Sequence, residues 1–269
     1  MKIIICPDAA RAAGLAARLL ADQVRDKADS VLGLATGRTM EAIYRLLVGT
    51  ARARGIGFGG VTTFNLDEYV GLGAEDAQSY RHYMQAHLFS HVDLAPGRTH
   101  VPDGAAPDAD AEAAAYEARI ARAGGIDLQL LGLGENGHIG FNEPLSSLAS
   151  RTRVVTLAQA TLVQNAGMFG GDLSRVPNRA ITMGTGTILE ARRALMVVTG
   201  AGKAAIAARA IEGPVCAAVP GSALQFHPDC LVLLDEAAAS ALTQRDAIEW
   251  QMRHDAELVA IQSAASGGR

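Results

Sequence analysis

Short apolar runs of β-type residues alternate with longer alanine-rich amphipathic stretches along most of this chain. The apolar runs cover residues 2–6, 30–35, 61–66, 126–134, 179–183, 194–199, 215–219 and 229–235. The main amphipathic stretches cover residues 8–25, 39–54, 108–123 and 202–211. This alternation predicts an α/β fold with a mostly parallel sheet, helices on both of its faces and right-handed crossovers.

Length and charge narrow the possibilities further. A chain of 269 residues suits a single domain, 1–269, better than two. A formal charge of -4, without any basic stripe, argues against a nucleic-acid binder. Cys6, Cys216 and Cys230 lack metal-ligand spacing and resemble core hydrophobes of a reducing compartment. No leader and no apolar run of eighteen residues occurs, so we expect a cytoplasmic protein that does not associate with membranes.

A glycine-punctuated loop follows the apolar run at 126–134 directly. Glycines at 132, 134 and 137 permit sharp turns and close approach to a ligand. His138 can carry a proton, and Glu143 can orient the imidazole. Because ligands bind beyond the carboxyl ends of parallel strands, this loop predicts an active site. The alternative is a glycine-rich turn with a surface histidine.

Two other segments have features that are typical of anion-binding sites. Thr36, Gly37, Arg38 and Thr39 follow an apolar run and precede a helix expected from about Met40, where backbone N–H groups can hold a phosphate. A plain Thr-capped helix start is the alternative. Lys203 lies in the first turn of another predicted helix, where a cation opposes the helix dipole unless an anion compensates. It is therefore either a phosphate ligand or a solvated lysine.

Adjacent acids close the apolar run at 61–66. Either Asp67 or Glu68 can act as a general base at such a strand end, and helix capping by Asp67 is the alternative. No metal-binding motif accompanies these segments. The residues together predict a site for a phosphorylated small molecule that needs neither metal nor cofactor.

The polar region at about 145–178 contains Gly167, Gly170, Gly171 and Pro177 and shows no periodicity. Its position after the glycine-rich loop predicts a mobile lid beside the site.

Several of these motifs resemble, in order and spacing, those of the glucosamine-6-phosphate deaminases. They are Leu32-Gly33-Leu34-Ala35-Thr36-Gly37, Phe64-Asn65-Leu66-Asp67-Glu68-Tyr69, Ser79-Tyr80, the run from Gly132 to Pro144, Ser150-Arg151-Thr152-Arg153-Val154 and Gly202-Lys203-Ala204. The resemblance spans about residues 2 to 243. It implies a Rossmann-like three-layer α/β/α sandwich that converts an aminohexose 6-phosphate to fructose 6-phosphate and ammonia in aminosugar catabolism. It adds a possible homo-oligomer and the hydrolase class to these expectations.

The resemblance also implies roles for individual residues. His138 would assist opening of the sugar ring, with Glu143 holding and polarising its imidazole. Asp67 would move a proton between C2 and C1, and Asn136 would complete the catalytic group. Thr36, Gly37, Arg38, Thr39 and Lys203 would hold the phosphate.

Four positions depart from the family pattern. Asn136 replaces an Asp of many members, which removes a negative neighbour from His138. Gly167 occupies the place of the lid arginine, whereas Arg38 adds a guanidinium to the phosphate segment. Val155 replaces the lysine found in allosterically activated members.

These departures leave other functions open. Galactosamine 6-phosphate is the alternative substrate. A 6-phosphogluconolactonase-like hydrolase shares the expected fold, and a non-catalytic sugar-phosphate sensor would keep the pocket without turnover.

Overall fold

The computed structural model describes residues 1–264, so residues 265–269 of the predicted domain lie outside the described residues. Its main sheet has seven parallel strands in the order β1-β10-β9-β6-β2-β3-β5. The strands are β1 (Lys2–Cys6), β2 (Val31–Leu34), β3 (Thr62–Asn65), β5 (Thr99–His100), β6 (Leu128–Leu131), β9 (Arg193–Val198) and β10 (Cys230–Asp235). The expected parallel α/β architecture is confirmed.

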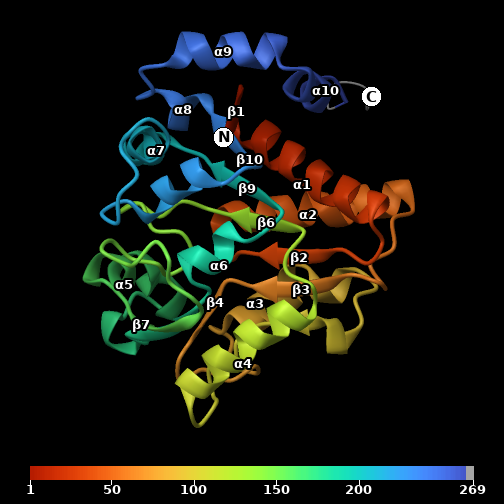
Figure 1. The fold of residues 1–269 in the computed structure, drawn as a ribbon. Coiled ribbons are helices and arrows are strands. Elements are labelled where there is room, and N and C mark those ends of the chain that lie inside the picture. The colour runs from red at the N-terminus through yellow and green to blue at the C-terminus, as the bar shows by residue number, and fades with distance from the viewer. Residues whose placement is uncertain (265–269) are drawn as a thin grey trace.

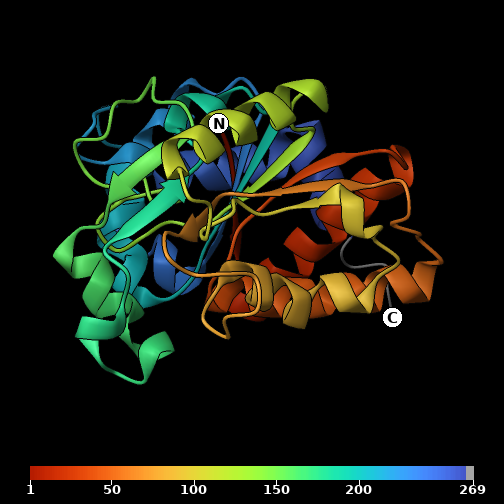
Figure 2. The same cartoon turned by 90° about the horizontal axis from the view of Figure 1, so that it is seen from below.

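Helices cover both faces of this sheet, as Figure 1 shows. They are α1 (Ala9–Asp26), α2 (Arg38–Arg54), α3 (Tyr80–His87), α4 (Ala109–Arg122), α5 (Gln159–Asn165), α6 (Thr185–Leu189), α7 (Ala204–Ile211), α8 (Glu236–Ala239), α9 (Arg245–His254) and α10 (Ala256–Ala264). Short 3-10 turns lie at η1 (Phe89–His91), η2 (Pro96–Arg98), η3 (Ala166–Phe169), η4 (Leu173–Arg175), η5 (Ala201–Lys203) and η6 (Pro220–Phe226). Seen from below, α2 and α4 lie on opposite sides of the strands (Figure 2), which makes three layers.

Local chemistry explains where the helices begin and end. Asp8 accepts a hydrogen bond from the backbone N–H of Arg11 and so caps α1, and Asp108 does the same for α4. α2 ends at Gly55, which takes the left-handed conformation that favours glycine. Every residue of β2, β6 and β10 is buried, as expected for strands covered on both faces.

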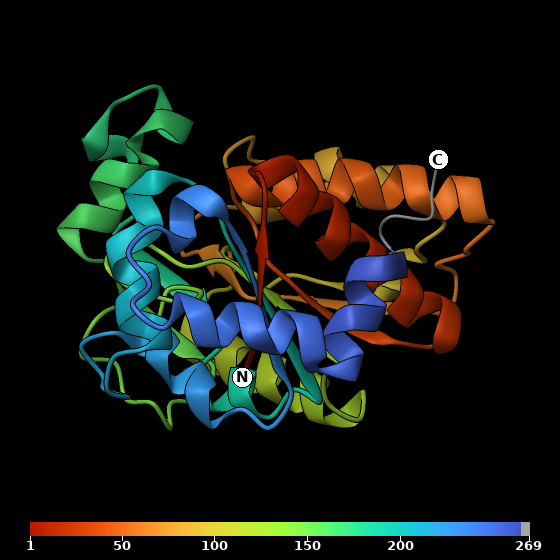
Figure 3. The same ribbon diagram turned by 90° about the horizontal axis from the view of Figure 1, so that it is seen from above.

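A second, three-stranded antiparallel sheet lies beside the main one. It consists of β4 (Asp67–Tyr69), β8 (Arg179–Thr182) and β7 (Arg153–Thr156), with β8 in the centre. The strand expected at 179–183 therefore exists but pairs outside the main sheet. The region expected to be irregular, 145–178, contains both β7 and α5, and Figure 3 shows α5 at the margin of the molecule.

The strand expected at 215–219 is wrong. Pro214 and Pro220 bracket this run, and proline lacks the N–H group that a sheet ladder needs. Cys216 and Val219 instead form an isolated bridge across a turn, and the Ser222 hydroxyl accepts the N–H of Cys216. The apolar character of the run reflects burial of Val219, not strand formation.

Two of the three cysteines lie in the core. Cys6 and Cys230 are buried among apolar residues, whereas Cys216 is only partly buried. None of the described helices combines the length and the apolar character that a bilayer span requires.

Candidate active site

Four polar segments meet at one edge of the main sheet. They follow β2, β3, β6 and β9, which are neighbours in the order β9-β6-β2-β3. Because the four strands are parallel, their carboxyl ends lie at the same edge. The predicted site segments, although distant in the sequence, thus come together.

The start of α2 forms an open anion cradle. Its N-cap is Gly37, whose φ of 120° is unfavourable for other residues, and no side chain caps the helix. Among the described residues, the backbone N–H groups of Arg38 and Thr39 have no acceptor. The alternative of a Thr-capped helix start is therefore wrong, and the free N–H groups suit an oxyanion.

Lys203 lies immediately before α7 and is half-buried. Burial lowers its pKa, and the nearby carboxylate of Glu135 acts in the opposite direction. No hydrogen bond or ion pair to its ammonium group occurs in the part of the chain that the structure describes. A partly desolvated cation without a close partner is well suited to bind an anion.

The adjacent acids Asp67 and Glu68 have different environments. Glu68 accepts hydrogen bonds from the N–H groups of Tyr80 and Arg81, each at 2.9 Å, and therefore caps the first turn of α3. It also accepts the N–H of Tyr69 at 2.9 Å. Burial still raises the pKa of Glu68 to about 7.

Asp67 caps no helix, so the capping alternative is wrong for this residue. Its side chain is 6% exposed, and burial, followed by the charge of Glu68, raises its pKa to about 8. The carboxylate faces Gly140 of the glycine-rich loop, where an added Cβ would lie 3.3 Å from Oδ2. An uncommitted buried carboxyl of this kind is a candidate proton carrier.

His138 and Glu143 form a pair in the loop after β6. His138 Nδ1 lies 3.4 Å from Glu143 Oε2, and both side chains are largely buried. A side chain at Gly134 would overlap the imidazole, so the absence of a Cβ there makes room for the ring. Glu143 Oε1 also accepts the N–H of Ala158, 3.2 Å away, at the start of α5.

Asn136 forms hydrogen bonds with both members of this pair. Its Nδ2 donates to Glu143 Oε2 over 2.7 Å, and its Oδ1 accepts the backbone N–H of His138 over 3.2 Å. Although burial opposes ionisation of Glu143, its polar neighbours His138, Thr161 and Asn136 lower its pKa to about 2. An aspartate could not make the first of these bonds.

The predicted residues are not equally well placed. Asp67, Asn136, His138 and Glu143 gather at the glycine-rich loop, and the anion cradle and Lys203 lie at the same sheet edge. Arg38 is exposed, as are Gly167 and Arg175 of the predicted lid. No group of three or more metal-ligating side chains occurs among residues 1–264.

Sequence reasoning did not single out two buried tyrosines that lie close to the candidate site, Tyr69 and Tyr80. Both occur in the motifs quoted above, but neither carries the charge or nucleophilicity that singles out a candidate. The Tyr80 hydroxyl lies 3.4 Å from the Tyr69 hydroxyl, and both rings contact Phe141 of the glycine-rich loop.

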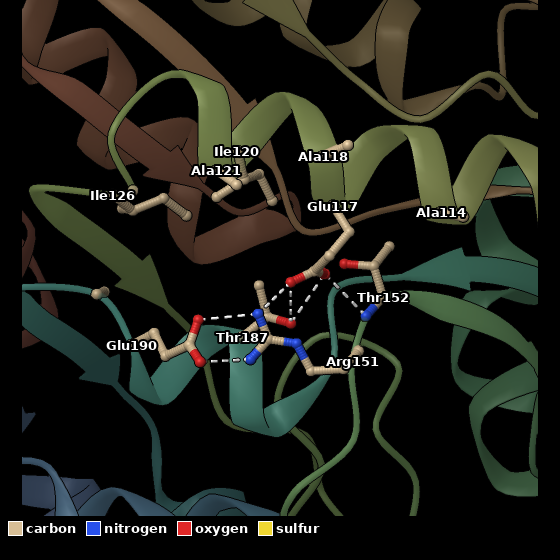
Figure 4. A pocket seen from close by; sticks show the side chains of 12 residues that line it. Ala114, Glu117, Ala118, Ile120, Ala121, Ile126, Arg151, Thr152, Thr187 and Glu190 are labelled. Carbon is tan, nitrogen blue, oxygen red and sulfur yellow. Dashed lines mark hydrogen bonds and ion pairs between the residues drawn. The ribbon is translucent and has the colours of Figure 1, made fainter.

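A cavity of about 500 Å³ lies elsewhere, between α4 and α6 (Figure 4). Arg151 crosses it, paired with both Glu117 and Glu190. Glu117 also accepts the Thr187 hydroxyl and the N–H of Thr152. The charged groups of this cavity satisfy one another, and none of the predicted site residues lines it.

We predict that Asn136→Asp raises the pKa of Glu143 above about 2. The substitution removes a hydrogen-bond donor and places a second carboxylate beside the first. At present the folded-state pKa lies below the ordinary 4.5, so the stabilisation from this carboxylate is complete above that pH and is lost as the pH falls towards 2. In the variant that stabilisation becomes smaller.

A carbon-13 NMR titration of the Glu143 carboxyl measures this effect directly. Asn136→Ala is the control, because it removes the donor without adding a charge and should shift the pKa less. An identical Glu143 pKa in the wild type and Asn136→Asp would contradict the contact.

Comparisons with known proteins identify the family of the chain. The model of a family described as glucosamine-6-phosphate isomerases/6-phosphogluconolactonase matches residues 8–232. A glucosamine-6-phosphate deaminase of Shewanella loihica is 51% identical over 247 residues, covering 91% of each chain. One of Cellvibrio japonicus is 51% identical over 243 residues, covering 90% of this chain and 92% of the relative.

Solved structures extend the comparison. A monomeric glucosamine-6-phosphate deaminase superimposes with a TM-score of 0.87 at 44% identity, covering 90% of this chain and 100% of the other. The 6-phosphogluconolactonase of Trypanosoma cruzi has a TM-score of 0.68 at 21% identity, with 90% and 97% covered, and shares the fold alone. The chain belongs to the glucosamine-6-phosphate isomerase/6-phosphogluconolactonase family.

Proposed function

We propose that this protein is a glucosamine-6-phosphate deaminase, which forms fructose 6-phosphate and ammonia in aminosugar catabolism. The observation that carries the proposal is the uncommitted buried carboxyl of Asp67 facing the glycine-rich loop that holds His138 and Glu143. The high identity to deaminases over nine-tenths of the chain supports it. Proton transfer next to a carbonyl requires a positioned base and a second acid–base group, and the site supplies both.

Substrate binding relies on the phosphate group. The free N–H groups at the start of α2 and the ammonium of Lys203 provide donors and positive charge for it. Because the phosphate is remote from the reacting carbons, its binding energy positions C1 and C2 and lowers the barrier of the chemical step.

The reaction then has three steps. His138 shuttles the proton between O1 and O5 as the C1–O5 bond breaks, while Glu143 holds the imidazole. Asp67 takes the proton from C2 and returns it to C1 through an enolamine, which leaves an imine at C2. Water adds to that imine, and ammonia departs as the C2–N bond breaks, so the net reaction consumes one water. This last step is the basis for the hydrolase class.

Galactosamine 6-phosphate is the second candidate substrate, and Asn136 is the observation that favours it. By the resemblance, asparagine occurs at this position in some deaminases of the family, including galactosamine-phosphate relatives. Incubation of the purified protein with each aminohexose 6-phosphate, and with 6-phosphogluconolactone, tests the assignment. Ammonia and ketose phosphate from glucosamine 6-phosphate support it. Lactone hydrolysis alone, or binding without turnover, contradicts it in favour of the lactonase or the sensor.

Three further expectations remain predictions. They are a cytoplasmic location, a homo-oligomer and closure of the segment at about 145–178 over the substrate. The contact between Glu143 and Ala158 supports the last, because it ties the catalytic loop to the start of α5.

Asp67→Asn is expected to abolish turnover while the protein still binds substrate analogues. The amide cannot abstract a proton. Because the folded-state pKa of about 8 lies above the ordinary 3.8, ionisation of Asp67 opposes folding as the pH rises. The free energy of unfolding at pH 7–8 should therefore be unchanged or larger in the variant. Steady-state kinetics and urea unfolding check both parts, and a wild-type rate would remove Asp67 from the mechanism.

Gly134→Ala should lower kcat by roughly a hundredfold, since the new methyl group overlaps the His138 ring and displaces the acid–base group. Gly14→Ala in α1 is the matched control, because an added Cβ there meets nothing within 4 Å. Activity of Gly134→Ala equal to that of the control would show that the imidazole position is not critical.

Arg38→Ser should weaken substrate binding roughly ten- to over a hundredfold if the exposed guanidinium folds onto the bound phosphate. Arg45→Ser removes an exposed arginine two turns further along α2 and serves as the control. An unchanged KM in Arg38→Ser would mean that this arginine stays in solvent, and Arg175 would be the next candidate.

A further inference from the structure

Two tyrosine hydroxyls bind the backbone of the turn that joins β2 to α2. Tyr44 of α2 donates a hydrogen bond to the carbonyl oxygen of Ala35 over 2.5 Å. Tyr83 of α3 donates to the carbonyl oxygen of Gly37 over 2.8 Å. The two acceptors are alternate carbonyl groups of one short turn, so the phenols hold this turn at two points.

Each of these bonds orients a whole peptide group. In a planar trans peptide, the N–H group points in the opposite direction to the carbonyl group that precedes it. None of the described peptide bonds is cis. Tyr44 therefore directs the N–H of Thr36 away from itself through the Ala35 carbonyl. Tyr83 does the same for the N–H of Arg38 through the Gly37 carbonyl.

The N–H groups of this turn are available to a ligand. Within residues 1–264, no acceptor is found for the backbone N–H of Thr36, Gly37, Arg38 or Thr39. Successive N–H groups at the start of a helix form a concave site that suits an anion. The phenols thus bind the carbonyl oxygens of the same turn whose N–H groups form the cradle.

The two carbonyl groups differ in their other donors. Gly37 O also accepts the N–H of Met40 at 2.9 Å and that of Glu41 at 3.3 Å, which are bonds of the first helical turn. For Ala35 O, the Tyr44 hydroxyl is the sole donor in the described part of the chain. The orientation of the peptide between Ala35 and Thr36 therefore depends more strongly on its phenol.

Both phenols are well placed to keep these bonds. Tyr44 is 0% exposed and Tyr83 is partly buried, so solvent competes little for their protons. Burial raises the pKa of both phenols above the ordinary 10, and each therefore keeps the proton that it donates. The Tyr83 ring also contacts His87 one turn further along α3, with 4.4 Å between the ring centroids.

The alternative orientation of these peptides would be unfavourable for an anion. A rotated peptide would present its carbonyl oxygen to the cradle and turn its N–H away. Glycine at position 37 lowers the barrier to such a rotation, because it has few backbone restrictions. Donors that are fixed before the ligand arrives remove the cost of this reorientation from the binding free energy.

We propose that Tyr44 and Tyr83 are positioning residues of the anion cradle, whose hydroxyl groups hold two carbonyl groups of the turn so that the N–H groups of Thr36 and Arg38 remain directed at a bound phosphate group. Neither tyrosine takes part in a step of the reaction. The inference rests on the proposed function only in that the phosphate group belongs to the substrate.

Inorganic phosphate is the probe, and amide NMR spectra recorded during its titration give both the dissociation constant and the response of each N–H group. In the wild type, the Thr36 and Arg38 amide protons should shift downfield as they bind the anion. Tyr44→Phe should weaken phosphate binding roughly tenfold and reduce mainly the Thr36 shift. Tyr83→Phe should weaken binding roughly threefold and reduce mainly the Arg38 shift, because helical bonds still hold its carbonyl group.

Tyr116→Phe is the matched control. Tyr116 of α4 is buried, and its hydroxyl donates to the carbonyl oxygen of Asn65 at the end of β3 over 2.8 Å. The control thus loses a phenol–carbonyl bond of the same kind outside the cradle. Urea unfolding should show a loss of stability comparable to that of Tyr44→Phe, whereas phosphate affinity and both amide shifts should stay at their wild-type values. Because Tyr83 is only partly buried, Tyr83→Phe provides the test if Tyr44→Phe does not fold.

The outcomes separate two failures. Wild-type affinity and wild-type amide shifts in both Tyr44→Phe and Tyr83→Phe overturn the positioning role alone. Equally weakened binding in Tyr116→Phe also overturns it, since the effect would then follow from general loss of stability. Absence of phosphate binding to the wild type overturns the cradle and the positioning role together, while turnover of the sugar substrate would still decide the proposed function.

Discussion

The parallel alignment of four neighbouring strands is the constraint on which the site depends. The strands occur along the chain in the order β2, β3, β6 and β9 but lie in the order β9-β6-β2-β3 in the sheet. A polar segment follows the last residue of each strand, and parallel pairing puts all four segments at one edge. Residues as distant in sequence as Thr36 and Lys203 therefore lie at the same edge of the sheet.

The pairing of the second sheet determines where the side chains of the adjacent acids Asp67 and Glu68 are directed. β4 pairs with β8 in antiparallel fashion, and neighbouring side chains of a strand point to opposite faces. Glu68 consequently meets the backbone N–H groups of α3, whereas Asp67 faces the glycine-rich loop. A buried acid without donors is costly to ionise, and such groups are found at functional sites because proton transfer requires a shifted pKa.

The glycine-rich loop shows how little freedom the acid–base pair has. The imidazole of His138 fills the space above Gly134, Asn136 binds both the loop backbone and Glu143, and Glu143 reaches the start of α5. These contacts restrain His138 and Glu143, and the bond from Ala158 to Glu143 also connects the pair to the start of α5. A site whose side chains are already ordered before the substrate binds needs less free energy to reach a reactive geometry.

The amino-acid sequence by itself determined the strand–helix alternation, the approximate extents of α1, α2, α4 and α7, and the identity of the polar segments that follow the central strands. These are local properties: hydrophobic periodicity, capping residues such as Asp8 and Asp108, and glycines at turns. The strand predicted at 215–219 was wrong because a buried turn and a buried strand can have the same local composition. Only the tertiary structure decided that 179–182 joins a second sheet, that Asp67 and not Glu68 stays uncommitted, and that Asn165 of α5 hydrogen-bonds Tyr69. Each of these depends on a partner far away in the chain, and local sequence patterns contain no information about which distant groups will meet.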